Sequence, residues 1–518
     1  MIFTTLKFMV FFSIVFLVYY MMPKKWQWKW LLLASYVFYM SASPLYVIFL
    51  VFTTLVTYFG ANAMSNYNEQ QKIYLKEHKE LSREDKKEYG NIIQKKKKRI
   101  LIAVILCTIG LVIVLKYSMF VLQNIQGLFF LLGKSITVPT LKWILPIGLS
   151  FYVFQSLGYC IDVYWEMYLS EKNLGKHALF VSYFPQILQG PIGEYQKMSV
   201  TLYEEKTFDY ERTVQGALRV AWGFFKKLVI ADNIAVIVNP VFQLTAVSTG
   251  KVVFIALLLY SIELYADFSG YMDIAIGCSK MLGIELAENF DTPYFSKNIT
   301  EFWRRWHISL GTWFKNYVFY PMLRSNLCTG LRKKHKKNKY LASMLPNVIA
   351  LAVVWLLIGL WHGADWCYVL YGIYHGTFII LAVIMAPLYD KFYEKFTKLK
   401  TSKIYHFLCM IRTFLIVTVG YILFVPGSFQ STLIIIKNIC SSHLGQGINI
   451  MNTLSISPKI ILSTIVLFGV DVISLKYNPI ALVRKLPFVI RMAGYLAFIF
   501  FIIAFMQTEA SEFLYFQF

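Results

Sequence analysis

The chain is organised around the stretch Asn298-Ile-Thr-Glu-Phe-Trp-Arg-Arg-Trp-His307-Ile-Ser-Leu-Gly-Thr-Trp-Phe-Lys-Asn-Tyr317. A basic loop and an apolar run separate it from the block Gly359-Leu-Trp-His362-Gly-Ala-Asp-Trp366. Four of the eight histidines of the chain lie between residues 298 and 376: His307, His362 and His375 in apolar sequence, and His335 in the basic loop. Since ionisable side chains in strongly apolar surroundings are costly and are usually retained for function, we predict that 298–376 is the core region of the functional site.

The first of these blocks has the pattern of an amphipathic helix. Asn298 followed by Glu301 is a variant of the capping box and predicts a helix start. At about 100° per residue, one arc of a continuous helix is mainly aromatic and the opposite arc mainly basic or polar. The first arc holds Trp303, Trp306, His307, Leu310, Trp313, Phe314 and Tyr317; the second holds Arg304, Arg305, Thr312, Lys315 and Asn316. Such a helix suits a membrane interface.

Two interpretations of the histidines compete. An inward-facing His307 fits a histidine that is hydrogen-bonded in a packed core. His362, however, ends the apolar run Leu345–Trp361, where an ionisable group is a functional candidate. One imidazole with a pKa near neutrality acts as a general base, and a second orients or polarises the partner group. We therefore assign His362 as the base, His307 as its partner and His375 to a structural role.

Composition predicts an all-α polytopic membrane protein. Of the 518 residues, 57% are hydrophobic and 15% charged, whereas soluble proteins have about a quarter charged residues. Apolar stretches of about 17–25 residues recur along the chain, and they predict about 11–12 transmembrane helices. No internal repeat divides the sequence, so we expect one domain over residues 1–518.

The net charge of +23 has its largest excesses in short segments between spans. Residues 66–99 contain eleven basic and six acidic residues, and 324–339 contain seven basic residues and no acid. By the positive-inside rule both segments are predicted to be cytoplasmic, which places both termini outside. We predict that 66–99 is a solvated hairpin, for which a helical form is compatible with the sequence. This distribution favours a membrane protein over nucleic-acid binding.

Several polar residues lie within apolar or broken segments. Gln155 lies in the predicted span Leu141–Tyr164, and Gln189 lies in the Pro- and Gly-rich stretch Ser182–Ile192. Broken backbone at membrane depth must be buried in protein or line a wet cavity. Glu263 and Asp267 are four residues apart and share a helix face. Three interpretations are open: an acid pair, a metal site, or partners of buried bases such as Arg304 or Arg305. Structural pairing is the favoured reading, because no His/Cys set lies nearby. The seven cysteines have no C-x-x-C spacing and predict neither disulfides nor a metal.

The segments Glu301–Tyr317 and Leu360–Trp366 resemble the two signature blocks of the membrane-bound O-acyltransferase superfamily, in the branch typified by bacterial alginate O-acetyltransferases. Further similarity lies in Leu145–Phe151, Ser182–Ile192, Trp222–Asn233, Asp267–Tyr271 and Glu288–Tyr294. One block departs from that branch. Its members usually continue Tyr-x-Pro-Leu-Gly-Gly-Asn-Arg, whereas this chain has Tyr320-Pro-Met-Leu-Arg-Ser-Asn326. The acceptor therefore stays open among alginate, cellulose, peptidoglycan, teichoic acid and other polymers.

The resemblance implies a fold with interfacial and re-entrant helices around a central tunnel in the bacterial plasma membrane. It implies a cytoplasmic acyl donor, acetyl-CoA, and a polysaccharide acceptor that receives the acetyl group directly or through an extracytoplasmic partner acetyltransferase. No permanently bound cofactor, metal or nucleic acid is expected, and membrane lipid surrounds the chain. The candidate substrate-binding or tunnel-lining residues are Trp303, Trp306, Arg304, Arg305, Trp361, Asp267, Asp273, Gln155, Gln189 and His375.

The residues agree with acyl transfer from a thioester. This reaction needs a base for the hydroxyl proton, stabilisation of the oxyanion and exclusion of water, but no protein nucleophile. The chain has no G-x-S-x-G, P-loop or G-x-G-x-x-G motif, and Cys367 has no basic neighbour in sequence. Two alternatives are D-alanyl transfer to teichoic acids from a carrier protein, and a polysaccharide exporter or flippase. Two Trp-His blocks without evident twofold internal symmetry argue against the exporter.

Overall fold

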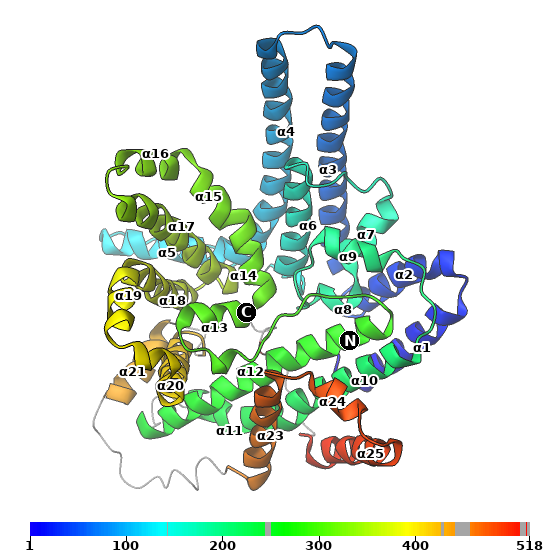
Figure 1. Ribbon diagram of the computed structural model, residues 1–518, viewed down its shortest axis with the longest axis vertical. Coiled ribbons are helices and arrows are strands. Elements are labelled where there is room, and N and C mark those ends of the chain that lie inside the picture. The colour runs from blue at the N-terminus through cyan, green and yellow to red at the C-terminus, as the bar shows by residue number, and fades with distance from the viewer. Residues whose placement is uncertain (142, 244–249, 426–428, 441–455, 508–513, 515–518) are drawn as a thin grey trace. The chain divides into compact units, whose positions relative to one another are not determined.

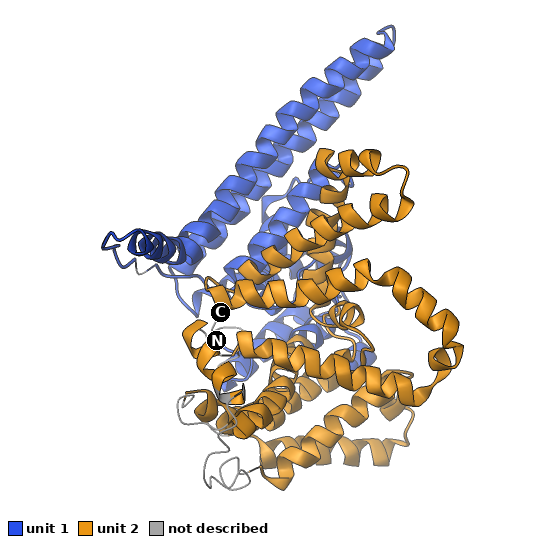
Figure 2. Ribbon diagram, turned by 90° about the vertical axis from the view of Figure 1, so that its left-hand side faces the viewer, with its two compact units in different colours: residues 1–216, 275–287 blue, residues 217–274, 288–518 orange. Residues whose placement is uncertain are grey.

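The computed structural model describes all residues except 142, 244–249, 426–428, 441–455, 508–513 and 515–518. Within the described residues the chain is helical, and β-pairing is confined to one isolated bridge, Phe290–Trp306. The residues form two compact units, 1–216 with 275–287 and 217–274 with 288–518 (Figure 2). Both α10 (Tyr210–Phe224) and α12 (Gly250–Met281) contain a boundary between the units. The expectation of a single domain stays a prediction.

The all-α membrane class is confirmed. Seven helical segments are long and apolar enough to cross a membrane: Tyr46–Glu77, Arg83–Leu131, Gly250–Met281, Lys339–His362, Trp366–Ile384, Lys403–Leu423 and Phe488–Phe505. This number, taken over the described residues, is lower than the predicted 11–12 spans. Three further apolar helices, α1 (Leu6–Met21), α6 (Leu149–Tyr164) and α23 (Pro458–Ser474), have 16, 16 and 17 residues, short of the ~20 that an upright span needs. The span expected from Leu141 starts only at Leu149, because Gly148 turns the chain with φ 77°.

In the first unit, α3 (Tyr46–Glu77) and α4 (Arg83–Val112) run side by side as a long helical hairpin (Figure 1). Ser82 caps α4 by accepting a hydrogen bond from the Asp85 amide. Near the tip Tyr74 stacks on Tyr89, with ring centroids 4.1 Å apart. The helical hairpin predicted for 66–99 is therefore confirmed. A π-helical turn (η2, Ile113–Tyr117) joins α4 to α5 (Ser118–Leu131).

The broken stretch Ser182–Ile192 is largely buried in protein. Burial was one of the two predicted possibilities, the other being the lining of a wet cavity. Helix α7 (Leu174–Ser182) ends before the short α8 (Phe184–Ile187), and an irregular segment follows. Gln186 Nε2 donates to Gln155 Oε1 and, over 2.6 Å, to the Pro191 carbonyl, while Gln155 Nε2 donates to the Phe180 carbonyl at 2.6 Å. Gln155 is thus a buried brace for this backbone. Gln189 is buried as well.

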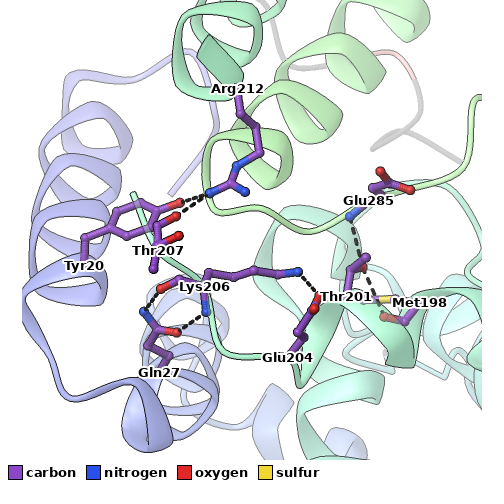
Figure 3. A network of polar contacts seen from close by, with 9 residues as sticks. All are labelled: Tyr20, Gln27, Met198, Thr201, Glu204, Lys206, Thr207, Arg212 and Glu285. Carbon is purple, nitrogen blue, oxygen red and sulfur yellow. Dashed lines mark hydrogen bonds and ion pairs between the residues drawn. The ribbon is translucent and has the colours of Figure 1, made fainter. Parts of the chain in front are cut away.

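The segment that follows α9 (Tyr195–Leu202) is fixed by side chains of the N-terminal helices (Figure 3). Gln27, in α2 (Gln27–Met40), exchanges two hydrogen bonds with the backbone of Lys206, each 2.9 Å long. Arg212 donates to the Tyr20 hydroxyl at 3.1 Å and to the Thr207 carbonyl at 2.8 Å. These contacts satisfy polar groups of a non-helical connection inside an apolar protein.

The second unit contains the region that carries the candidate site. Its described elements after α10 are η3 (Phe225–Ala231), α11 (Asp232–Gln243), α12, η4 (Pro293–Phe295), α13 (Ile299–Arg305), α14 (Ile308–Phe314), η5 (Lys315–Phe319), α15 (Tyr320–Arg324), α16 (Asn326–Lys334), α17 (Lys339–His362), α18 (Trp366–Ile384), α19 (Ala386–Lys395), η6 (Thr397–Thr401), α20 (Lys403–Gly420), η7 (Tyr421–Leu423), α21 (Phe429–Cys440), α23, α24 (Pro479–Arg484) and α25 (Phe488–Phe505). The basic segment 324–339 contains the amphipathic helix α16. The apolar run Leu345–Trp361 lies in α17, and α18 follows it as the second helix of a hairpin.

The prediction of one continuous helix after Asn298 is wrong. Asn298 does cap α13, accepting from the Glu301 amide at 2.8 Å, but α13 ends at Arg305 and α14 begins at Ile308. Between them Trp306 is extended and pairs with Phe290. The break is stabilised by pairing with a distant segment, which periodicity within one helix cannot reveal.

Candidate active site

His307 is positioned by the loop that precedes α13. The Asn289 side-chain oxygen accepts hydrogen bonds from the amide and the hydroxyl of Ser309, each 2.9 Å long, and lies 3.4 Å from His307 Nδ1. The Ile308 amide also donates to the Asn289 carbonyl at 3.1 Å. Because an amide oxygen only accepts, this arrangement favours the proton on Nδ1 and leaves Nε2 as the basic nitrogen. Burial lowers the pKa of His307 to about 3, so its imidazole is neutral at pH 7.

The backbone around His307 is strained on both sides of the Phe290–Trp306 bridge. His307 has φ 49° and Thr292 has φ 44°, a region that costs a side-chain-bearing residue about 1–3 kcal/mol. Arg305 holds this geometry by donating to Thr292 Oγ1 at 3.0 Å and pairing with Glu301 at 3.0 Å. Arg305 therefore acts on the loop that carries Asn289, whereas Arg304 is exposed. Strain of this kind persists where the surrounding structure holds a functional group in place.

His362 is the last residue of α17. The indole ring of Trp361 packs against both His362 and His307. The Trp361 ring centroid lies 5.7 Å from that of His307 and 5.1 Å from that of His362. Tyr371 and Phe424 pack on His362 with centroids 5.8 and 5.4 Å away. His307 and His362 are 2% and 4% exposed. The two imidazoles singled out from the sequence are thus both buried and both packed against one indole.

His375, in α18, packs against the same group of aromatic rings. Tyr371 lies 4.6 Å from its ring and Trp303 lies 5.0 Å away, measured between centroids. His375 is fully buried, and a Cβ added to Gly420 would approach its Nε2 to 2.7 Å. Trp306 packs against Phe290, with centroids 5.0 Å apart. The close packing around the His375 ring fits the structural role predicted for this residue, which stays a prediction.

Asp273 is held by two basic residues. It binds Arg219 Nε at 2.9 Å and also pairs with Lys226. Arg219 in turn binds Glu288, which precedes Asn289 in the sequence, at 2.6 Å. Burial opposes the charge of Arg219, but Asp273 and Glu288 outweigh it and raise its pKa.

Asp267 shares a lysine with Asp232. Lys227 Nζ lies 2.7 Å from Asp267 and 2.8 Å from Asp232. Burial disfavours the Lys227 ammonium, yet the two carboxylates raise its pKa. Of the two acids for which pairing was predicted, Asp267 is paired, with Lys227 rather than with Arg304 or Arg305. Glu263 is buried but forms no ion pair among the described residues. The bases that bind Asp267 and Asp273 come from α10 and from the π-helical turn η3, in which the consecutive residues Lys226 and Lys227 both contact α12.

A family model of membrane-bound O-acyltransferases matches residues 170–430, about half of the chain. The protein named "Probable alginate O-acetylase AlgI" from Pseudomonas aeruginosa is 31% identical over 440 residues, which cover 83% of this chain and 73% of that protein. The chain belongs to the membrane-bound O-acyltransferase family. The Azotobacter vinelandii protein of the same name is 38% identical over 280 residues, 54% of this chain and 52% of that relative. The match thus spans about half the length of that relative.

A "Peptidoglycan O-acetyltransferase" from Helicobacter pylori is similar along most of this membrane-bound O-acyltransferase. It is 28% identical over 434 residues, which cover 79% of this chain and 72% of the relative. The names of these similar proteins thus give two different polymers, alginate and peptidoglycan.

Sequence reasoning missed several residues of the site. Asn289 lies in Glu288–Tyr294, and Lys227 lies in Trp222–Asn233, two segments noted only for their family resemblance. That resemblance was the signal that could have marked them. Tyr371 and Phe424 carried no signal, because an aromatic residue in an apolar helix is ordinary core material. Gln155 and Gln189 belong to the first compact unit, and their substrate-binding role stays a prediction.

Proposed function

We propose that this membrane-bound O-acyltransferase moves an acetyl group from acetyl-CoA to hydroxyls of a cell-surface or exported polysaccharide. The observation that carries the proposal is the pair His307 and His362, both buried and both against Trp361, with Asn289 at His307 Nδ1. The names of the alginate and peptidoglycan acetylating relatives support a polysaccharide acceptor. A partner transferase outside the membrane is a second route by which the acetyl group reaches the polymer.

In the proposed mechanism His362 accepts the proton of the attacking hydroxyl. The new bond joins that hydroxyl oxygen to the acyl carbon, and the carbon–sulfur bond of the thioester breaks. The thiolate of coenzyme A then takes the proton from the imidazolium, which returns His362 to its neutral state. His307, neutral because of its burial, orients the acceptor or donates a hydrogen bond to it. The aromatic surroundings exclude water, which would otherwise hydrolyse the thioester.

The proposed orientation places the basic segments 66–99 and 324–339 in the bacterial cytoplasm and both termini outside. Residues 515–518 at the C-terminus lie outside the described residues. In this orientation acetyl-CoA arrives at the cytoplasmic side, and a tunnel near the histidines connects it to an acceptor on the other side. The basic segments favour approach of the phosphate-bearing donor.

Sealed vesicles of opposite orientation test donor, reaction and sidedness together. Release of coenzyme A is expected when acetyl-CoA is added to inverted vesicles that carry the protein and its acceptor, and not with right-side-out vesicles. Permeabilised right-side-out vesicles should regain the activity and serve as the control. Turnover with a D-alanyl carrier protein in place of acetyl-CoA would instead show D-alanyl transfer. Polymer export without thioester consumption would contradict acyl transfer and support an exporter.

Substitution of Asn289 is expected to change the pH profile as well as the rate. Asn289→Ala removes the acceptor 3.4 Å from His307 Nδ1 and should lower kcat about 10-fold, a typical effect of losing an orienting partner. Asn289→Asp keeps an acceptor but adds a negative charge, which raises the pKa of His307. A higher pKa means protonation at higher pH, so the acid limb of the rate profile should move upward.

The rate of coenzyme A release between pH 4 and 9 measures both effects. A purely structural role for Asn289 predicts lower stability with an unchanged acid limb in Asn289→Asp. That result, together with an unaltered kcat for the folded Asn289→Ala fraction, would refute the positioning role. Ser309→Ala is the matched control, because it removes one hydrogen bond to the same oxygen and leaves the His307 contact in place.

A further inference from the structure

The basic run Lys95-Lys-Lys-Lys-Arg99 of α4 has two distinct sides. Lys97 is buried and pairs with Glu166 at 2.6 Å. The other four residues are exposed. With 3.6 residues per turn, they lie on one broad face and Lys97 lies on the opposite one. We call Lys95, Lys96, Lys98 and Arg99 the α4 basic belt.

The α4 basic belt lies where α4 changes from polar to apolar. Directly after it come Ile102 and Leu106, which are 45% and 68% exposed. Large aliphatic side chains exposed on a membrane helix face lipid tails, so the preceding turn lies at headgroup level. The belt is therefore placed where lipid phosphates lie.

The end of α6 adds an apolar anchor beside the α4 basic belt. Gln94 donates to the Tyr164 hydroxyl at 3.0 Å, and Lys97 lies over the Tyr164 ring at 5.6 Å. The next residues include Trp165 and Met167, which are 40% and 58% exposed. Tryptophan favours the membrane interface because its ring is apolar and its N–H is polar.

The charge of the belt differs from that of the rest of the hairpin. Around the tip, basic residues alternate with five acids: Glu77, Glu80, Glu84, Asp85 and Glu88. Between residues 89 and 99 the sequence contains no acid. The neighbouring carboxylate of Glu166 is already bound by Lys97. The positive-inside rule requires cationic residues in the cytoplasmic segment. It does not require that these residues lie on one helix face, at the headgroup level and without neighbouring acids.

We propose that the α4 basic belt binds the headgroups of anionic phospholipids, with Trp165 and Met167 seated among the adjoining acyl chains. The partner fits in charge, because four cations without a competing acid face the phosphate level. It also fits in shape, because an apolar helix surface continues from the belt into the membrane. Clusters of this size next to a membrane helix attract anionic lipid by simple electrostatics. The inference does not depend on the acyl transfer proposed above.

Lipid binding to the full-length protein in neutral detergent tests this inference. Native mass spectrometry would follow the titration of phosphatidylglycerol and, separately, of phosphatidylcholine with the same acyl chains. The wild-type protein is expected to bind phosphatidylglycerol at least about 10-fold more tightly, and added salt should weaken this preference. The variant Lys95→Gln/Lys96→Gln/Lys98→Gln/Arg99→Gln should lose it.

The matched control also replaces three lysines and one arginine, but in the part of the hairpin nearer its tip. Lys72→Gln/Lys76→Gln/Arg83→Gln/Lys87→Gln should keep the preference for phosphatidylglycerol. Equal loss in both variants would overturn the proposal in favour of net charge alone. Displacement of the lipid by millimolar coenzyme A would overturn it in favour of a site for soluble phosphates. Should the belt variant fail to fold, Lys95→Gln/Lys98→Gln is expected to show part of the loss, and an unchanged preference would contradict the inference.

Discussion

His362→Ala is expected to lower acyl transfer by about 10²–10⁴-fold, the usual cost of losing a general base. His362 is the terminal residue of α17 and packs against the rings of Trp361 and Tyr371, so we expect the hairpin to stay inserted without its imidazole. Coenzyme A release in reconstituted membranes would measure the rate, and thermal denaturation would confirm the fold. Polymer export in cells should continue while acetylation is lost.

His375→Ala is the matched control, because it removes a second buried imidazole from the same hairpin. It should reduce the melting temperature by leaving a cavity beside Tyr371 and Trp303, while the folded fraction keeps most of its rate. Near-full acetylation by His362→Ala would rule out its role as the base. A larger catalytic loss in His375→Ala than in His362→Ala would reverse the assignment of the two residues.

Much of the architecture follows from local sequence. A break at Ser43-Pro44 separates α2 from α3, because proline disfavours helix in the residue before it. The charged tip between Glu77 and Arg83 separates α3 from α4. The start of α13 follows from Asn298, whose side chain accepts from the Glu301 amide. The Trp-His blocks also indicated where the candidate site lies. In each case the determining residues are neighbours in the chain, so their effect is visible in the sequence.

The remaining features depend on residues that are far apart in the sequence. The break at His307 requires the Asn289–Thr292 segment, and the pairing of Asp273 requires Arg219. An amphipathic pattern at Trp303–Tyr317 is equally compatible with one helix or with two helices separated by an extended residue. For the same reason, the sequence alone does not distinguish Arg304 or Arg305 from the actual basic partner of Asp267, which is Lys227 in η3. Only tertiary contacts distinguish these possibilities.

Gly372→Val is expected to disrupt the α17–α18 hairpin. A Cβ on Gly372 would lie 2.3 Å from the Trp355 carbonyl oxygen and 2.9 Å from the Gly359 Cα. Both atoms belong to backbone, so the clash cannot be relieved by turning a side chain. In membranes, small residues at such crossings allow close packing that lipid cannot replace. The expected loss is about 3 kcal/mol or more, at the upper end of overpacking.

Thermal denaturation in detergent and coenzyme A release would measure this loss. Both should fall in Gly372→Val, because separation of the helices moves His362, on α17, away from Tyr371, on α18. Gly494→Val in α25 makes the same change where an added Cβ meets no atom within 4 Å, and it should leave both measurements near the wild-type values. Equal stability of the two variants would show that the approach of Gly359 and Gly372 does not hold the hairpin together. Lost activity with full stability in Gly372→Val would mean instead that the close approach serves only to place His362 against Tyr371.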